Sequence, residues 1–222
     1  REELGNRPSP IYFSASEPLG SYTALDPQDC GGNPRIVTRE EWGARPPSSS
    51  SSMPTPVPFV IIHHTVTSHC FTVEACIPVV RQIQNYHMDT NGWEDIGYRQ
   101  GNSISNPRGN CHFLVGEDGN VYEGRGWDKV GTHTPGFNSR GIAISVMGNF
   151  MEVLPNSAAL TAIERLIECG TGLGMILGDY SLMGHRQASD TLCPGDFLFD
   201  EIETWGHFDP SPEERGRAGF EE

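Results

Sequence analysis

Apolar residues recur along this chain in two periods, one typical of buried strands and one typical of amphipathic helices. The strands predicted from continuous or alternating apolar runs are residues 36–38, 59–62, 113–115, 121–123 and 141–148. The helices predicted from three- and four-residue apolar spacing are residues 72–88, residues 156–170 and a segment after Cys193 that reaches Trp205. Strands and helices therefore alternate. This predicts an α/β (α+β) domain with a central mixed β-sheet flanked by about three helices.

The apolar run at residues 59–62 ends in His63 and His64. Because alternate side chains of a strand point to opposite faces, at most one of these imidazoles easily joins a single cluster of ligands. Far along the chain, His185 is followed eight residues later by Cys193. Two His and one Cys suit zinc, and a fourth position left open for water or substrate is the mark of a catalytic site. The alternative is that these histidines are ordinary surface or core residues.

Composition separates the domain from its flanking segments. Residues 1–34 are rich in Pro, Gly, Ser and acidic residues and show no periodicity, so they are interpreted as an N-terminal extension. Residues 207–222 are interpreted as a disordered C-terminal tail. A chain of 222 residues is rather short for two domains, so we expect a single domain over residues 35–206.

The charge and hydropathy of the chain argue against two classes of partner. Asp and Glu outnumber Lys and Arg by 29 to 15, and the formal net charge of -14 repels phosphate backbones and anionic bilayers. We therefore expect no nucleic acid partner. No apolar stretch approaches the roughly 20 residues that cross a bilayer, so no membrane span is expected in this chain.

Cysteine spacing indicates one disulfide. Cys70 and Cys76 are close enough in sequence to close a small loop, and such a pair implies an oxidising compartment; the alternative is two unrelated buried thiols. If Cys193 is a metal ligand, three cysteines remain and at least one has no partner within the chain. These three are Cys30, Cys111 and Cys169.

Eight motifs occur in the order typical of one known family: Trp42-Gly43-Ala44, His63-His64-Thr65, Cys70 with Cys76, His87-Met88, Asp95-Ile96-Gly97-Tyr98, Tyr122-Glu123-Gly124-Arg125-Gly126-Trp127, Met147-Gly148-Asn149, and His185 with Cys193-Pro194-Gly195. Over roughly residues 35–206 the sequence resembles the peptidoglycan recognition proteins. This resemblance implies a mixed sheet with three helices, and a relation to zinc amidases of the phage lysozyme type. It also implies a secreted protein of innate immunity whose partner is bacterial peptidoglycan or its muramyl peptides.

Within this family, catalytic members are N-acetylmuramoyl-L-alanine amidases, which cut between the lactyl group of muramic acid and the first residue of the stem peptide. Non-catalytic members bind peptidoglycan and signal. By motif position His63, His185 and Cys193 match the ligands of Zn2+, and all three are present. The resemblance therefore favours the enzyme over a recognition module. A purely structural zinc site is disfavoured, because closed sites usually have four strong ligands.

The resemblance also assigns roles to residues around the metal. Tyr98 and Thr191 match positions that assist the catalytic water and the transition state; the alternatives are a core tyrosine and a turn hydroxyl. Gly92, Trp93 and Arg125 match the set that accompanies diaminopimelate stem peptides, whose additional carboxylate a guanidinium can bind bidentately. The alternatives are a core Trp and a solvated Arg. The remaining substrate-binding positions are His64, His87, His133 and Asn138.

Two features depart from the family pattern. The family continues from the position of Tyr98 directly into the next strand, whereas here an insert over residues 99–111 intervenes. The insert also brings Cys111, for which the pattern has no partner. The resemblance pairs Cys30 with Cys169, which leaves Cys111 as the unpaired cysteine.

Overall fold

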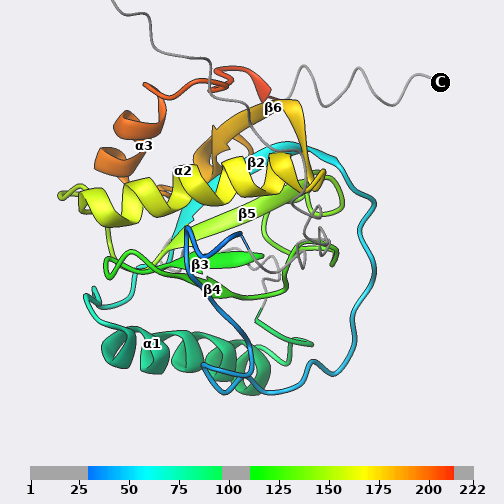
Figure 1. Cartoon of the computed structure of the whole chain (residues 1–222), viewed down its shortest axis with the longest axis vertical. Coiled ribbons are helices and arrows are strands. Elements are labelled where there is room, and N and C mark those ends of the chain that lie inside the picture. Colours follow the sequence, from blue (N-terminus) through cyan, green and yellow to red (C-terminus); the bar gives the residue numbers. More distant parts are fainter. Residues whose placement is uncertain (1–29, 97–110, 213–222) are drawn as a thin grey trace, which may run out of the picture.

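Six strands form one sheet in the order β1-β4-β3-β5-β2-β6 in the computed structural model, which describes residues 30–96 and 111–212 (Figure 1). The strands are β1 (Ile36–Val37), β2 (Val57–His64), β3 (Phe113–Val115), β4 (Val121–Glu123), β5 (Gly141–Val146) and β6 (Ile176–Gly184). Strands β3 and β4 form the predicted antiparallel hairpin, and the other neighbouring pairs are parallel. The predicted mixed sheet is therefore confirmed.

The helices cover the two faces of this sheet. They are α1 (Val73–Asn85), which continues as the π-helical turn η1 (Tyr86–Thr90), α2 (Ser157–Gly172), the 3-10 turn η2 (His185–Gln187) and α3 (Asp196–Ile202). Ile62 of β2 joins Leu166 of α2 in one core cluster, whereas Leu114 of β3 joins Val80 of α1 in another. Helices α1 and α2 therefore lie on opposite faces, as Figure 1 shows.

Both long helices begin where the sequence predicts. The Thr72 hydroxyl accepts a hydrogen bond from the Ala75 amide, and Asn156 Oδ1 accepts one from the Ala159 amide. The prediction for α3 was too long, because this helix ends at Ile202 and Trp205 lies in the turn that follows.

The expected tail begins later than residue 207. Leu182 donates its amide hydrogen to the His207 carbonyl, and the ring of His207 stacks on Tyr180 at 4.2 Å. Phe208 packs against the larger core cluster. The packing of Phe208 and the backbone hydrogen bond to His207 thus hold residues 207 and 208 against β6. Residues 213–222 lie outside the described part of the chain.

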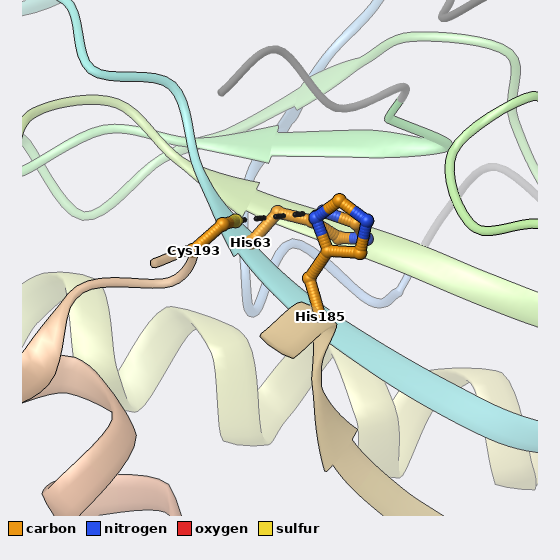
Figure 2. A group of neighbouring side chains, drawn as sticks. All are labelled: His63, His185 and Cys193. Carbon is orange, nitrogen blue, oxygen red and sulfur yellow. Dashed lines mark hydrogen bonds between the residues drawn. The ribbon is translucent and has the colours of Figure 1, made fainter. Parts of the chain in front are cut away.

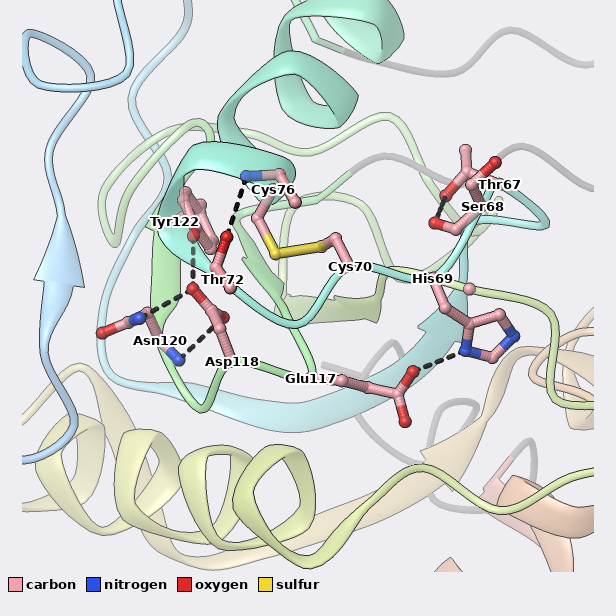
Figure 3. The surroundings of a disulfide bond; sticks show 12 residues. Thr67, Ser68, His69, Cys70, Thr72, Cys76, Glu117, Asp118, Asn120 and Tyr122 are labelled. Carbon is pink, nitrogen blue, oxygen red and sulfur yellow. Dashed lines mark hydrogen bonds and ion pairs between the residues drawn. A yellow bond between two sulfur atoms is a disulfide. The ribbon is translucent and has the colours of Figure 1, made fainter.

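Two disulfides join the elements. Cys70 is bonded to Cys76 at the start of α1, and Figure 3 shows this bond between α1 and the loop that precedes it. Cys30 is bonded to Cys169 of α2. Cys111 and Cys193 are buried and not in a disulfide. Within the described residues, no helix is both long and apolar enough to cross a membrane.

Candidate metal centre

Two segments that are far apart in sequence bring His63 together with His185 and Cys193 (Figure 2). His63 lies near the end of β2, and His185 directly follows β6, the strand beside β2. Their rings are 4.4 Å apart between centroids. Because β2 and β6 are parallel, their carboxyl ends meet at one edge of the sheet, where ligand sites of parallel sheets commonly lie.

The spacing of His63 and Cys193 fits a tetrahedral zinc ion. One ligand atom from each of the three residues lies within 4.8 Å of the others, and His63 Nδ1 is 3.7 Å from Cys193 Sγ. Two ligands of tetrahedral zinc with ordinary bond lengths are about 3.4 to 3.6 Å apart. His185 Nδ1 is buried and has no hydrogen-bond partner among the described residues. Such an atom is available as a ligand, so these residues fit zinc.

Burial sets the protonation of the three residues. Desolvation lowers the pKa of His185 to about 4. It also lowers the pKa of His63 well below its usual value, and the neighbouring His185 and His133 add to this effect. Both imidazoles are therefore neutral at pH 7, the form that binds a metal. Desolvation raises the pKa of Cys193 to about 12, so this thiol has to lose a proton when a metal binds.

Arg186 holds the loop that carries Cys193. Its backbone amide donates to the Cys193 carbonyl at 2.8 Å, and its guanidinium donates to the Leu192 carbonyl and to the Asp196 carboxylate. Within the same loop, the Thr191 hydroxyl accepts the amide hydrogen of Cys193 at 3.2 Å. The loop between His185 and Cys193 is thus fixed by several hydrogen bonds that no sequence motif revealed.

His64 faces away from the metal cluster, as strand alternation predicts. Its Nδ1 accepts the amide hydrogen of Phe150, a residue of the core cluster on the α2 face. Its backbone amide donates to Cys193 Sγ at 3.4 Å. The His64 side chain is 1% exposed and lies on the other face of β2 from that of His63, and its role as a substrate contact stays a prediction.

Comparison with known proteins assigns the chain to a family. The family model described as N-acetylmuramoyl-L-alanine amidase matches residues 53–196. Peptidoglycan-recognition protein SC2 of Drosophila simulans is 42% identical over 173 residues, which cover 78% of this chain and 87% of the relative. The structure of PGRP-SA from bumblebee superposes with a TM-score of 0.73 at 41% identity, covering 81% of this chain and 99% of the other. This chain belongs to the peptidoglycan recognition protein family.

Two further relatives bear on the function of this peptidoglycan recognition protein. A human protein named N-acetylmuramoyl-L-alanine amidase is 42% identical over 181 residues, which cover 80% of this chain and 29% of that protein. The structure of peptidoglycan recognition protein-LE holds tracheal cytotoxin, described as monomeric diaminopimelic acid-type peptidoglycan. It is 38% identical and has a TM-score of 0.72, covering 80% of this chain and 98% of the other. Named relatives thus include both an enzyme and a ligand-binding protein.

The other expected site residues are spread over two regions of this recognition protein. His133 lies beside the metal cluster, with its ring 5.6 Å from that of His63, and Asn138 Oδ1 accepts the amide hydrogens of His133 and Thr134. The ring of His112, a residue that the sequence analysis did not single out, lies 5.4 Å from that of His133. Its Nδ1 accepts the Ala143 amide hydrogen and its Nε2 is 2.9 Å from the Lys129 carbonyl, so it joins two segments of the core.

The second region contains the residues expected to contact the stem peptide. The ring of Trp93 lies 4.7 Å from that of His87, and Gly92 precedes Trp93 with a positive φ of 68°. The guanidinium of Arg125 donates from Nε to the Ile96 carbonyl and from Nη1 to the Val130 carbonyl, each at 3.0 Å. Tyr98 lies outside the described residues.

Proposed function

We propose that this peptidoglycan recognition protein is a zinc amidase that hydrolyses the bond between the lactyl group and L-alanine in bacterial peptidoglycan. The observation that carries the proposal is the cluster of His63, His185 and Cys193, whose ligand atoms lie within 4.8 Å of one another. The match to the amidase family model and the identity to a human amidase support it. A set of two His and one Cys leaves the open position that catalytic zinc requires.

Zinc in this position supplies a Lewis acid for the amide carbonyl and lowers the pKa of a water molecule toward about 7. His63 and His185 are neutral at pH 7 because burial lowers their pKa values. The Thr191 oxygen accepts the Cys193 amide hydrogen, so its own hydroxyl hydrogen is directed elsewhere and can be donated to a substrate oxygen. The role proposed for Tyr98 is a hydrogen bond to the oxyanion that develops in the transition state.

The proposed substrate preference is for stem peptides that contain diaminopimelate. Arg125 uses Nε and Nη1 in its hydrogen bonds with described residues, which leaves Nη2 for a ligand carboxylate. Burial lowers the pKa of Arg125, whereas the charges of Asp95 and Glu94 raise it. A partly desolvated guanidinium binds a carboxylate more strongly than an exposed one does. Trp93 beside His87 is proposed to pack against the same part of the stem.

The proposed location is extracellular. Two disulfides, Cys30–Cys169 and Cys70–Cys76, are of the kind that persists in oxidising compartments and is rare in the cytosol. Peptidoglycan outside host cells is the proposed target, and the proposed role is in innate immunity.

Binding without cleavage is the second candidate function, and the burial of the metal cluster favours it. His63, His185 and Cys193 are 0%, 4% and 1% exposed, and a substrate carbonyl has to reach them for hydrolysis to occur. Several relatives are named recognition proteins rather than amidases. In this case a muramyl peptide binds in the region of Trp93 and Arg125 and is released unchanged.

Metal analysis combined with a peptidoglycan digest separates the two functions. The amidase proposal predicts one zinc per chain and the release of stem peptides with a free L-alanine amino group. Replacing Cys193 by Ser should abolish release and leave binding intact, because the binding residues lie elsewhere. Cys111→Ser is the matched control, since Cys111 is also buried and outside a disulfide, and it should keep full activity. Release of peptides by the Cys193 variant would refute the metal assignment, and binding without release by the unaltered protein would support the second function.

A further inference from the structure

Ser145 is a buried serine of β5 whose hydroxyl oxygen has no hydrogen-bond partner among the described residues. Its neighbours along the strand, Ile144 and Val146, are apolar and buried. Buried polar atoms are nearly always hydrogen-bonded, and an alanine would fill this place without leaving an oxygen unsatisfied. The hydroxyl of Ser145 therefore needs an explanation other than packing.

The register of the sheet places Ser145 beside His63. Strands β2 and β5 are parallel, and His63 and Ser145 are paired residues. Their side chains therefore lie on one face of the sheet. Leu114, which pairs with Ser145 from β3 and packs in the core cluster of α1, lies on that face too. On the other side of β2, the ring of His185 is 4.4 Å from that of His63 (Figure 2). His63 is thus flanked by His185 and by Ser145.

The two ring nitrogens of His63 have different surroundings. Nδ1 is 3.7 Å from Cys193 Sγ and is the proposed ligand atom. Nε2 is buried and has no partner among the described residues. When Nδ1 of a neutral imidazole binds a metal, Nε2 carries the hydrogen, and this N–H almost always donates to an acceptor that orients the ring. His63 therefore needs an acceptor for the hydrogen on Nε2.

Two buried acceptors near His63 are unsatisfied within the described residues, Ser145 Oγ and His133 Nε2. The serine is favoured, because a hydroxyl can accept one hydrogen bond and donate another at the same time. Burial raises the pKa of the Cys111 thiol to about 12, and the nearby Ser145 hydroxyl lowers it. These two side chains are thus neighbours, although their geometry is too poor for a hydrogen bond. The hydroxyl hydrogen can point toward this sulfur while the oxygen accepts from His63.

We propose that Ser145 is a positioning residue for the metal, because its hydroxyl oxygen accepts the Nε2 hydrogen of His63 when zinc binds at Nδ1. The inference rests on the zinc of the proposed function and not on cleavage. Neighbouring strands are about 4.8 Å apart, so side chains of paired residues are within reach of each other once the serine rotates. The unsatisfied hydroxyl then destabilises the protein without zinc and stabilises the complex with zinc.

Competition for zinc against a chromophoric chelator at pH 6 tests this contact. Ser145→Ala should lower the zinc affinity by about 10- to 100-fold, the usual effect of removing a partner of a metal ligand. Ser145→Thr keeps the hydroxyl and should stay within about threefold of the unaltered protein. Ser181→Ala is the matched control, because Ser181 is also buried in a strand but its Oγ is 3.0 Å from Asp209 Oδ2. This control should bind zinc as tightly as the unaltered protein.

Thermal unfolding of chelator-treated protein tests the same hydroxyl in the opposite direction. Ser145→Ala removes a buried polar atom that has no partner among the described residues, so the melting temperature should stay equal or rise. Ser181→Ala removes a hydrogen bond to a carboxylate, so it should melt about 3 to 6 °C lower. A serine that only supports the sheet would behave like Ser181.

The ring of His63 gives a readout that does not depend on affinity. In zinc-loaded protein with 15N-labelled histidine, NMR should find the hydrogen of His63 on Nε2 and show that it exchanges slowly with water. This exchange should be faster in Ser145→Ala and unchanged in Ser181→Ala. Equal exchange rates in both variants would contradict a hydrogen bond to Ser145.

The outcomes distinguish this inference from the proposed function. If the unaltered protein binds no zinc, the metal assignment fails and the inference falls with it. If zinc binds and Ser145→Ala keeps the full affinity, only the role of Ser145 is refuted. Chelator-treated Ser145→Ala that melts as low as Ser181→Ala would also refute it, since the hydroxyl would then have a structural partner. A protein that binds zinc but releases no stem peptide would contradict the amidase and not this inference.

Discussion

Zinc affinity should rise tenfold for each pH unit between about pH 5 and 6.5, because one proton is displaced in this range, below the pKa of about 7 that a zinc-bound water would have. The pKa of Cys193 is about 12, five units above pH 7, so about one molecule in 100,000 carries the thiolate in the metal-free protein. Each rise of one pH unit makes the thiolate ten times more abundant. His185 has a pKa of about 4 and His63 also has a lowered one, so the imidazoles bind no protons in this range. Below about pH 5 they become protonated and the slope should steepen.

The assay is competition for zinc against a chromophoric chelator of known affinity, at constant ionic strength from pH 5 to 8.5. A plot of the logarithm of the zinc association constant against pH should have a slope of one up to about pH 6.5, and a steeper slope above it, where a zinc-bound water would also lose a proton. The slope should fall to zero in Cys193→Ser and stay at one in Cys111→Ser. A slope of two or three near pH 6 would show that the imidazoles titrate at ordinary values, and would refute the argument from burial. A zero slope in the unaltered protein would show that Cys193 is no ligand, or that its thiol is already ionised.

Three further predictions concern specificity and stability. Arg125→Val should weaken binding of a diaminopimelate muramyl peptide by about 10- to 100-fold and of the lysine counterpart much less, measured by calorimetry; equal losses would contradict a carboxylate contact. Asn156→Ala should lower the melting temperature by about 3 to 6 °C, because the α2 cap and the bond from Asn156 Nδ2 to the Glu117 carbonyl are both lost. Replacing Cys30 and Cys169 together by Ala should cost about 3 to 5 kcal/mol of unfolding free energy, since their bond closes a loop of 139 residues. An unchanged urea midpoint would contradict this.

The sequence revealed the elements whose burial is uniform. Strand β2 is buried at all but one position and β5 at every position, so both could be predicted from their apolar runs. Strand β6 was not predicted, because residues 177–179 are exposed and Ile176 pairs with β2 across a register shift. Such an edge strand has neither alternation nor a continuous apolar run. The end of α3 was misplaced because Trp205 continues the apolar spacing after the backbone has left the helix.

The chemistry of the cluster was easier to predict than its environment. Ligand residue types at the ends of strands indicated zinc, and alternation correctly separated His63 from His64. The partners of the buried polar groups depend on contacts between distant segments, and no local pattern encodes them. Phe150, which donates to His64, is 86 residues away in sequence, and Ala143, which donates to His112, is 31 residues away. The resemblance assigns His64 to the substrate by its motif position, and this role stays a prediction.

Departures from the rules of folding concentrate where β2 ends. His63 Nε2 and His64 Nε2 are buried without a hydrogen-bond partner among the described residues, as is Nδ1 of the neighbouring His185. Each such group costs about 1 to 3 kcal/mol relative to a satisfied one. Val66 adds backbone strain three residues after His63. Because folding alone would favour removing these costs, their position at the carboxyl edge of a parallel sheet, where ligand sites commonly lie, supports the proposed ligand site there.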